Sequence, residues 1–325
     1  MTEAMTGATK RDKRMGLPTR DAYGQALAEL GKTHPQVVVL DADVSGSTRG
    51  RAFATAFPDR FFNFGIAEAN MISAAGGFAS SGKIPFTASF AAFLVNKGFE
   101  QLRMSVANPR LNAKFCGSHS GISLGDDGAS QMAVEDVALA CALPHFTVLV
   151  PSDEVATRAL VRAAADWVGP VYIRTGRPKA PLIYPEGEAF TIGRAKVLRP
   201  GRDATIIATG LMVWEALEAA WRLAERKLDV GVIDMHTVKP LDDEAVIAAA
   251  RRTGALVTAE EHLLDGGLGS RVAQAVCQEA PVPLVSVGLK DTYAESGTPE
   301  QLFDKYGLTA RHLVAAVEQV LKKKS

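Results

Sequence analysis

The sequence is poor in cysteine and in aromatic residues, and it carries no net charge. Three cysteines occur among 325 residues, namely Cys116, Cys141 and Cys277. Their number is odd, they lie far apart, and no two of them form a CxxC pair. This argues against a disulfide framework and against a zinc site, so a reducing compartment fits best. Lys plus Arg and Asp plus Glu balance at 36 each, so no global field favours nucleic acid. Any anionic ligand must be held by a local site.

Long apolar runs are also missing. The first sixteen residues, MTEAMTGATKRDKRMG, contain charges and small polar residues but no apolar core. They therefore predict a disordered tail over residues 1–16 rather than a signal peptide. No later segment is apolar enough to cross a bilayer. We expect a soluble, cytoplasmic chain that binds neither membrane nor nucleic acid.

What is present is a regular alternation of short β-branched runs with longer alanine-rich segments. VVVLDAD, IPFTAS and PVYIRTG are strand candidates in the first half, and ATIIATG, DVGVIDM and VPLVSVG are candidates in the second. Helix candidates such as EVATRALVRAAADW lie between them. This rhythm predicts an α/β fold with mostly parallel sheets and helices on both faces. A proline-bearing stretch over residues 181–200 predicts a linker between two domains, residues 17–180 and 201–325.

Polar residues cluster just after strand ends in the first half. Ser47 follows one strand in DADVSGSTRG, His119 follows another in CGSHSG, and Arg174 ends a third in YIRTG. Ligands in open α/β sheets bind outside the carboxyl ends of the strands, so these three side chains can converge on one ligand. A hydroxyl, an imidazole and a guanidinium suit an anionic group such as phosphate. A strand-end histidine can also be purely structural, and both interpretations remain open on this basis.

Two glycine-rich loops have a structural and a functional interpretation each. SLGDDGASQ, residues 123–131, is either a surface turn in which Asp127 caps a helix, or a substrate loop in which Asp127 accepts hydrogen bonds from sugar hydroxyls. DGGLGS, residues 265–270, is similar to a phosphate loop at a helix N-terminus. It lacks the GK[ST] ending and the GxGxxG spacing, so we expect it to pack a tight strand-to-helix turn.

A single carboxylate, Glu68, stands at the start of an apolar alanine-rich segment, GIAEANMISAAGG. A glutamate in a first helical turn can simply interact with backbone donors and the helix dipole. Phe90 and Phe93 follow the strand IPFTAS at helical spacing, and such a pair is commonly core. At the lip of a sheet close to Glu68, however, an aromatic ring could stack on a flat heterocycle while the carboxylate contacts its edge.

Several linked motifs resemble the C-terminal half of transketolase over nearly the whole chain. They include TRDAYGQALAEL, NFGIAEANMISAAGGFA, PFTASFAAFLVNKGFEQLRM, CGSHSGISLGDDGASQMAVEDVAL, IRTGRP, TVKPLD and EEHLLDGGLGS, in this order. The resemblance implies a pyrimidine-binding domain followed by the transketolase C-terminal domain, with thiamine diphosphate as cofactor. Glu68 then corresponds to the glutamate that shares a proton with a ring nitrogen of the aminopyrimidine, and Phe90 and Phe93 correspond to the aromatic platform.

The same resemblance implies the substrate contacts. Arg20, Ser47, His119 and Arg174 match the sugar-phosphate contacts of the family, and a sulfonate would satisfy the same donors. Asp127 matches the residue that contacts a substrate hydroxyl, and Gln131 falls where the family has a residue facing the reacting carbonyl region. We therefore expect Glu68, His119 and Gln131 to be the catalytic side chains.

The sequence departs from the family in one respect. Transketolases also carry an N-terminal domain whose GDG motif holds the diphosphate and Mg²⁺, and here only a short polar tail precedes DAYGQAL. The resemblance thus implies the second subunit of a split transketolase, with the Mg²⁺ ligands on an N-terminal-half partner and an α2β2 assembly. Two alternatives remain: the β-subunit of a 2-oxoacid dehydrogenase or a deoxyxylulose phosphate synthase, and a non-catalytic subunit that merely binds a partner.

Overall fold

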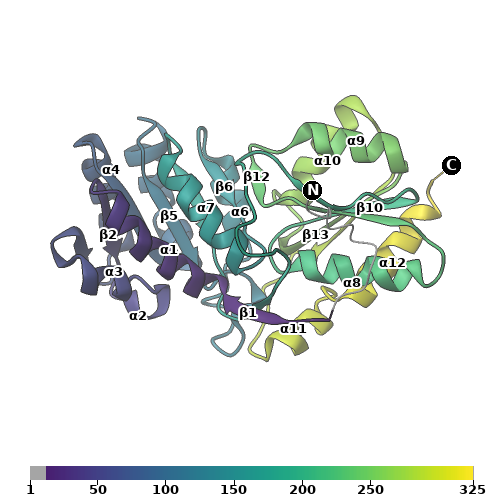
Figure 1. Cartoon of the computed structure of the whole chain (residues 1–325), viewed down its shortest axis with the longest axis horizontal. Coiled ribbons are helices and arrows are strands. Elements are labelled where there is room, and N and C mark those ends of the chain that lie inside the picture. The colour runs from purple at the N-terminus through teal and green to yellow at the C-terminus, as the bar shows by residue number, and fades with distance from the viewer. Residues whose placement is uncertain (1–11, 325) are drawn as a thin grey trace.

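Two α/β units lie side by side along the long axis of the molecule (Figure 1). The structure, a computed structural model, describes residues 12–324. The first unit is built on a seven-stranded sheet in the order β12-β6-β7-β5-β4-β2-β3. All pairings in it are parallel except that of β12 with β6. Its strands are β2 (Val37–Asp41), β3 (Phe61–Asn63), β4 (Ile84–Phe90), β5 (Lys114–Ser118), β6 (Thr147–Leu149), β7 (Val171–Arg174) and β12 (Thr237–Lys239).

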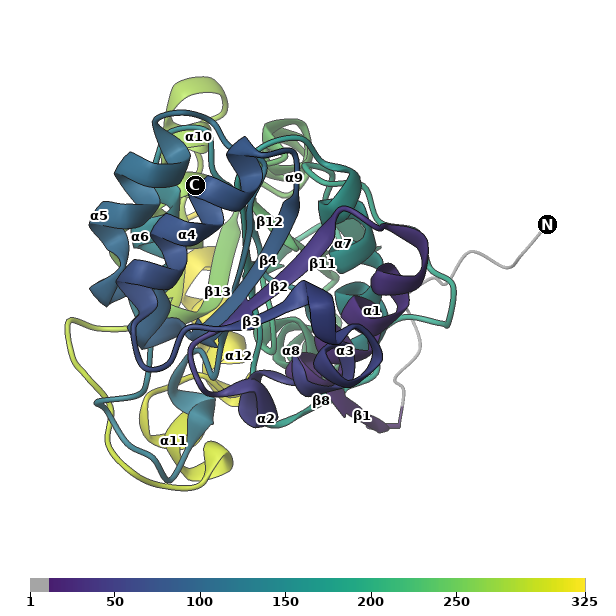
Figure 2. The ribbon, with the colours of Figure 1, turned by 90° about the vertical axis from the view of Figure 1, so that its left-hand side faces the viewer.

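Helices cover both faces of this sheet (Figure 2), and two separate apolar clusters lie beneath them. Strand β2, VVVLD, is buried at every position, as expected for a parallel sheet with both faces covered. On one face lie α1 (Thr19–Thr33), α3 (Arg51–Ala56) and α7 (Glu154–Asp166); on the other lie α4 (Glu68–Ser80), α5 (Phe99–Gln101), α6 (Asp136–Ala142) and the π-helices η2 (Ala92–Lys97) and η3 (Leu102–Ala107). Short turns are α2 (Ser45–Thr48) and the 3₁₀ segments η1 (Pro58–Arg60) and η4 (Ile122–Leu124).

The second unit has a five-stranded sheet in the order β14-β13-β10-β11-β9, parallel except for β9. Helix α9 shows why its elements form where they do: the Asp242 carboxylate accepts from the backbone N–H of Ala245 at one end, and Gly254 adopts a left-handed conformation at the other. Its strands are β9 (Lys196–Arg199), β10 (Ala204–Ala208), β11 (Val230–Asp234), β13 (Leu256–Leu263) and β14 (Leu284–Leu289). Its helices are α8 (Met212–Ala224), α9 (Asp243–Thr253), α10 (Leu268–Glu279), α11 (Pro299–Lys305) and α12 (Ala310–Leu321). The predicted α/β class with two mostly parallel sheets is confirmed.

The two units are interlocked. Strand β12, which the sequence assigns to the second domain, crosses over and pairs with β6 in the first sheet. The largest apolar cluster also crosses the boundary, because Ile122, Leu124 and Met132 of the first unit pack with the tryptophans of α8. The expected division into residues 17–180 and 201–325 therefore differs from the sheets at two strands: β12 joins the first sheet, and β9 of the second sheet lies within the expected linker, residues 181–200.

The predicted disordered tail over residues 1–16 lies mostly outside the described residues, which begin at residue 12. For its last two residues the prediction was wrong, since β1 (Met15–Pro18) pairs with β8 (Lys179–Pro181). The partner strand lies far along the chain, so no local pattern revealed the pairing. Within the described range, no helix combines the length and apolarity that crossing a bilayer requires.

The turn DGGLGS packs as the sequence predicts. The carboxylate of Glu260 accepts hydrogen bonds from the backbone N–H groups of Leu268 and Gly269, both at 2.7 Å. A side chain of the protein thus fills the N-terminus of α10, where an anion would otherwise bind. This turn is structural. The three cysteines are free.

Candidate active site

The predicted site lies at the carboxyl ends of the parallel strands of the first sheet. Strand β2 leads to α2, which contains Ser47; β4 ends at Phe90; and His119 directly follows β5. Glu68 is the first residue of α4. Adjacent parallel strands deliver their carboxyl ends to one edge, which is where open α/β sheets bind ligands.

Glu68 is almost fully buried, with only 3% of its side chain exposed. One carboxylate oxygen accepts a hydrogen bond from Nζ of Lys97 at 2.8 Å. A buried carboxylate without a partner is costly, so Lys97 stabilises it, as does the N-terminus of α4. Lys97 is a residue that the sequence analysis did not single out.

Phe90 and Phe93 lie with nearly parallel rings, 5.7 Å between centroids and 6° between planes. Both rings are partly exposed rather than core. The imidazole of His119 stacks on Phe90 at 3.9 Å and 15°, and Nζ of Lys97 lies 5.6 Å from the centre of the Phe93 ring. A continuous row from Glu68 through Lys97, Phe93 and Phe90 to His119 therefore joins the residues predicted for the cofactor to those predicted for the sugar.

His119 is held as a neutral imidazole of one tautomer. Arg20 Nη1 lies 2.6 Å from Nε2 of His119, and because a guanidinium can only donate, Nε2 is the acceptor. The proton therefore sits on Nδ1, which donates to the Ser118 hydroxyl at 2.8 Å. Burial, followed by the charges of Arg20, Arg177 and Arg49, lowers the pKa of His119 to about 3. The backbone of His119 has φ +58°, a strained value typical of functional positions.

Two further arginines act on this region, and sequence analysis missed both. Arg177 donates to the Asp127 carboxylate at 3.1 Å and to the Leu124 carbonyl at 3.3 Å. Arg49 binds Asp21 and the Gly46 carbonyl. Burial, together with the charges of Arg49 and Arg177, lowers the pKa of Arg20 although Asp21 opposes the shift. We call Arg20, Arg49 and Arg177 the arginine group.

Both arginines stand in motifs that the sequence already shows near strand ends. Arg177 stands in IRTGRP, just beyond the end of β7, and Arg49 stands in SGSTRG beside Ser47. Asp127 is paired with Arg177 and caps no helix in the described residues. Ser47 contributes its backbone carbonyl, which accepts from Arg20 at 3.4 Å.

The role expected for Arg174 is not supported. Its side chain is 7% exposed and makes a bidentate ion pair with Asp136, at 2.8 and 3.1 Å. The same guanidinium donates to the carbonyls of Ala133 and Glu261 at 3.1 and 3.0 Å. Burial, the largest single cause, would raise the pKa of Asp136, but the charge and hydrogen bonds of Arg174, with help from His262 and Tyr172, together lower that pKa. Carboxylate and carbonyl oxygens thus occupy the Nε and Nη2 donors of Arg174, and its bond to the Glu261 carbonyl links the two units.

Gln131 is half-buried and accepts a hydrogen bond from the hydroxyl of its neighbour Ser130. Within residues 12–324 it has no hydrogen bond to His119 or Glu68. The same part of the chain contains no group of three or more His, Cys, Asp or Glu side chains that could hold a metal ion.

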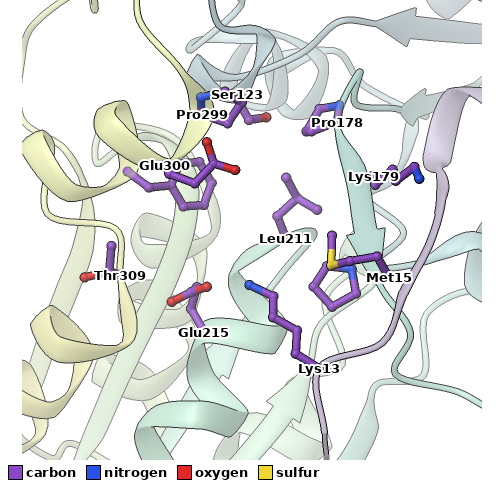
Figure 3. Close-up of a pocket in the computed structure, with 12 residues that line it drawn as sticks. Lys13, Met15, Ser123, Pro178, Lys179, Leu211, Glu215, Pro299, Glu300 and Thr309 are labelled. Carbon is purple, nitrogen blue, oxygen red and sulfur yellow. The ribbon is translucent and has the colours of Figure 1, made fainter.

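A separate cavity of about 190 Å³ lies between the units (Figure 3). It is lined by side chains of mixed charge, among them Lys13, Glu215 and Glu300, together with apolar side chains such as Leu211. None of the residues predicted for cofactor or substrate lines it.

The row of side chains fits a flat, protonatable heterocycle next to an anionic substrate. Partly exposed parallel rings offer a stacking surface, and a buried carboxylate beside them offers an acceptor for a ring nitrogen. The arginine group next to His119 offers several donors for an oxyanion. The fold and this site define the class of the pyrimidine-binding chains of thiamine-diphosphate enzymes.

Comparison with known proteins gives the family. The profile described as "Transketolase, pyrimidine binding domain" matches residues 15–181, and that described as "Transketolase, C-terminal domain" matches residues 193–313. The chain belongs to the transketolase family.

Two relatives and one solved structure match nearly end to end. A "Putative transketolase C-terminal section" of Methanocaldococcus jannaschii is 41% identical over 307 residues, covering 94% of this chain and 96% of the relative. A "6-deoxy-6-sulfo-D-fructose transketolase subunit SqwH" of Clostridium sp. (strain MSTE9) is 43% identical over 306 residues, covering 94% and 95%. A solved structure described as "Split gene transketolase, inactive beta4 tetramer" is 48% identical, with TM-score 0.88, and covers 95% of this chain and 100% of that one.

Proposed function

We propose that this chain is the C-terminal subunit of a split transketolase. With a partner subunit, it would transfer a two-carbon ketol unit from a ketose phosphate to an aldose acceptor. The observation that carries the proposal is the continuous row from Glu68 to His119, since it joins a cofactor-type site to an anion-binding site. A subunit that merely bound a partner would need neither end of this row.

Thiamine diphosphate, when bound, supplies the electron sink for cleaving a carbon–carbon bond next to a carbonyl. Phe93 and Phe90 offer the stacking surface for its pyrimidine ring, and Glu68 offers the carboxylate oxygen that holds a proton at a ring nitrogen. The ring stack also limits access of water to that carboxylate, which is nearly buried already. Ligands for Mg²⁺ are expected on the partner.

The arginine group would hold the anionic end of the sugar, and Nε2 of His119 would accept from a neighbouring sugar hydroxyl. Arg177 replaces Arg174 in this proposal, because the Arg177 side chain is 39% exposed whereas Arg174 is 7% exposed and held by a buried carboxylate. Asp127, positioned by Arg177, would accept from a sugar hydroxyl, and the Nε2 lone pair of His119 becomes available if Arg20 turns to the anion. Phosphate and sulfonate both suit these donors, and the name of the Clostridium relative refers to a sulfo-sugar.

The partner would be an N-terminal-half transketolase subunit in an α2β2 assembly. The supporting observations are the words "C-terminal section", "subunit" and "split gene" in the names of the relatives. The related structure is described as an inactive tetramer of β chains, so we expect this chain to be inert alone as well. Free cysteines suit the reducing cytoplasm, where we place the assembly.

The test is reconstitution. The purified chain, thiamine diphosphate and Mg²⁺ should show no ketol transfer until an N-terminal-half subunit is added, as measured by a coupled assay with a ketose phosphate donor. Glu68→Gln keeps the shape of the side chain but cannot share a proton, so kcat of the reconstituted enzyme should fall by roughly 10²–10⁴. Robust turnover by the chain alone, or by the Glu68→Gln complex, contradicts the proposal.

A further inference from the structure

Lys97 occupies an unusual place in the backbone. It is the last residue of the π-helix η2 (Ala92–Lys97), and the next residue, Gly98, separates η2 from α5. π-helical turns are rare and are often found at functional sites. This turn brings Lys97 across to the first turn of α4, where Glu68 lies.

The neighbours of Lys97 are anchored, whereas its own side chain is more than half exposed. Asn96 donates to the Glu135 carboxylate at 2.6 Å. Gly98 packs so closely that a Cβ there would meet Ile72 Cδ1 at 2.1 Å. The Lys97 side chain itself is 55% exposed. A flexible ammonium on a fixed backbone can therefore swing out without disturbing the helix.

The two contacts of the Lys97 ammonium are those proposed above for the cofactor. It donates to the Glu68 carboxylate at 2.8 Å, and it lies 5.6 Å from the centre of the Phe93 ring. Within residues 12–324 it is the one donor to that carboxylate. A cation near an aromatic ring and bonded to a carboxylate matches the chemistry of a protonated pyrimidine in the same place.

We propose that Lys97 is an intramolecular stand-in for the pyrimidine, which pairs with Glu68 while the site lacks its cofactor and withdraws when the ring binds. This inference rests on the proposed function for the identity of the ring. In the free chain, Lys97 keeps the buried carboxylate paired, so the site is stable before assembly. The same contact weakens cofactor binding, because the ion pair must break first.

A double-mutant cycle tests the pairing without any cofactor. Lys97→Met keeps the length of the stem but removes the charge, and it leaves the Glu68 carboxylate unpaired. It should lower the melting temperature of the chain, and the same change in a Glu68→Gln background should have a much smaller effect, because an amide needs no cation. Lys83→Met, on an exposed turn, is the matched control and should give the same small shift in both backgrounds. Equal shifts for Lys97→Met in both backgrounds overturn the proposal.

A binding titration tests the displacement. Thiamine without the diphosphate probes the pyrimidine side, and ligand-observed NMR with the full chain suits weak binding. Lys97→Met should bind thiamine about three- to tenfold more tightly than the wild type, since no ion pair must break. Lys97→Arg, which keeps the charge, should remain close to the wild type, and so should Lys83→Met.

The thiamine titration distinguishes failure of the Lys97 proposal from failure of the proposed function. If thiamine binds the wild type but Lys97→Met does not tighten it, the stand-in proposal is wrong and the proposed function stands. If thiamine binds no variant, even with an N-terminal-half subunit present, the proposed function is wrong and the stand-in proposal falls with it.

Discussion

Two arginines three positions apart in one motif differ in side-chain exposure and in the ion pairs that they form. Arg174 ends β7, is 7% exposed, and donates through Nε and Nη2 to Asp136 and two backbone carbonyls. Arg177, in the loop that follows, keeps 39% of its side chain exposed and makes one ion pair, with the half-exposed Asp127. Both are guanidinium groups at the same edge of the same sheet.

The difference lies in where the counter-charge comes from. Arg174 receives a buried carboxylate from its own chain, so its charge is cancelled locally and little remains for a ligand. Around Arg177 the positive groups outnumber the negative ones, since three arginines face Asp21 and Asp127. Burial is the largest cause of the low pKa of His119, and the charges of these arginines lower it further. Because Arg177 is more exposed and makes fewer bonds than Arg174, it has more donors left for an anion.

The largest expected effect is on stability at Arg174. Arg174→Met leaves Asp136 buried with only the Tyr172 hydroxyl as a side-chain donor, and an uncompensated buried carboxylate should lower the free energy of unfolding by about 3–5 kcal/mol. Urea denaturation followed by circular dichroism measures this. Arg177→Met should change it by about 0.5 kcal/mol or less, as is usual for partly exposed sites.

A paired replacement controls for lost packing. Arg174→Met with Asp136→Leu removes both charges and should recover much of the stability lost by the single change. A cost at Arg177 as large as that at Arg174 would erase the distinction between the two arginines.

The next effect is on substrate binding at Arg177. Arg177→Ala removes a charge-assisted bond worth about 1.5–3 kcal/mol, so KM for a ketose phosphate should rise roughly ten- to hundredfold in the reconstituted enzyme. The KM for hydroxypyruvate, which lacks the phosphate, should change little. An equal rise for both donors would mean that Arg177 acts on the fold rather than on the anion.

The smallest effect is on the protonation of His119. Inorganic phosphate bound at the arginine group should raise the pKa of His119 from about 3 towards its ordinary value, because it offsets the surrounding positive charge. Arg177→Ala should raise it as well. Imidazole NMR signals followed against pH, with and without phosphate, measure both changes, and a pKa unaffected by phosphate places the anion elsewhere.

The lowered pKa of His119 also predicts that the folded chain becomes less stable as the pH falls. Between about 3 and 6.5 the unfolded chain binds a proton at His119 that the folded chain does not bind. The contribution of His119 to stability is therefore complete above about pH 6.5 and is lost as the pH falls towards 3. Urea denaturation at pH 7 and pH 5 should show a smaller difference for His119→Gln than for the wild type.

The sequence predicted those features that local pattern and motif determine. The alternation of strands and helices, the strand-end positions of Phe90 and His119, and the position of Glu68 at a helix start are all local. The buried ion pair of Arg174 is not a local feature, because its partner Asp136 lies on a helix elsewhere in the chain. The motif IRTGRP contains two arginines, and nothing in it shows which of the two forms the buried ion pair.

Other features escaped the sequence for the same reason. Lys97 looks like an ordinary surface lysine until a π-helical turn brings it to Glu68. Strand β12 is the TVK of the motif TVKPLD, and its pairing with β6 depends on the path of the chain between the two sheets, which the motif does not show.

That crossing strand also constrains how the molecule can move. To swing one unit away from the other, β12 would have to be stripped from β6, and the bonds from Arg174 to the carbonyl of Glu261 would have to break together with the apolar contacts around Met132. Because these contacts tie the two units together, we expect the chain to unfold in a single cooperative transition in calorimetry rather than in two. The carboxyl-end edge of the first sheet would then open through single side chains rather than through a swing of one unit away from the other.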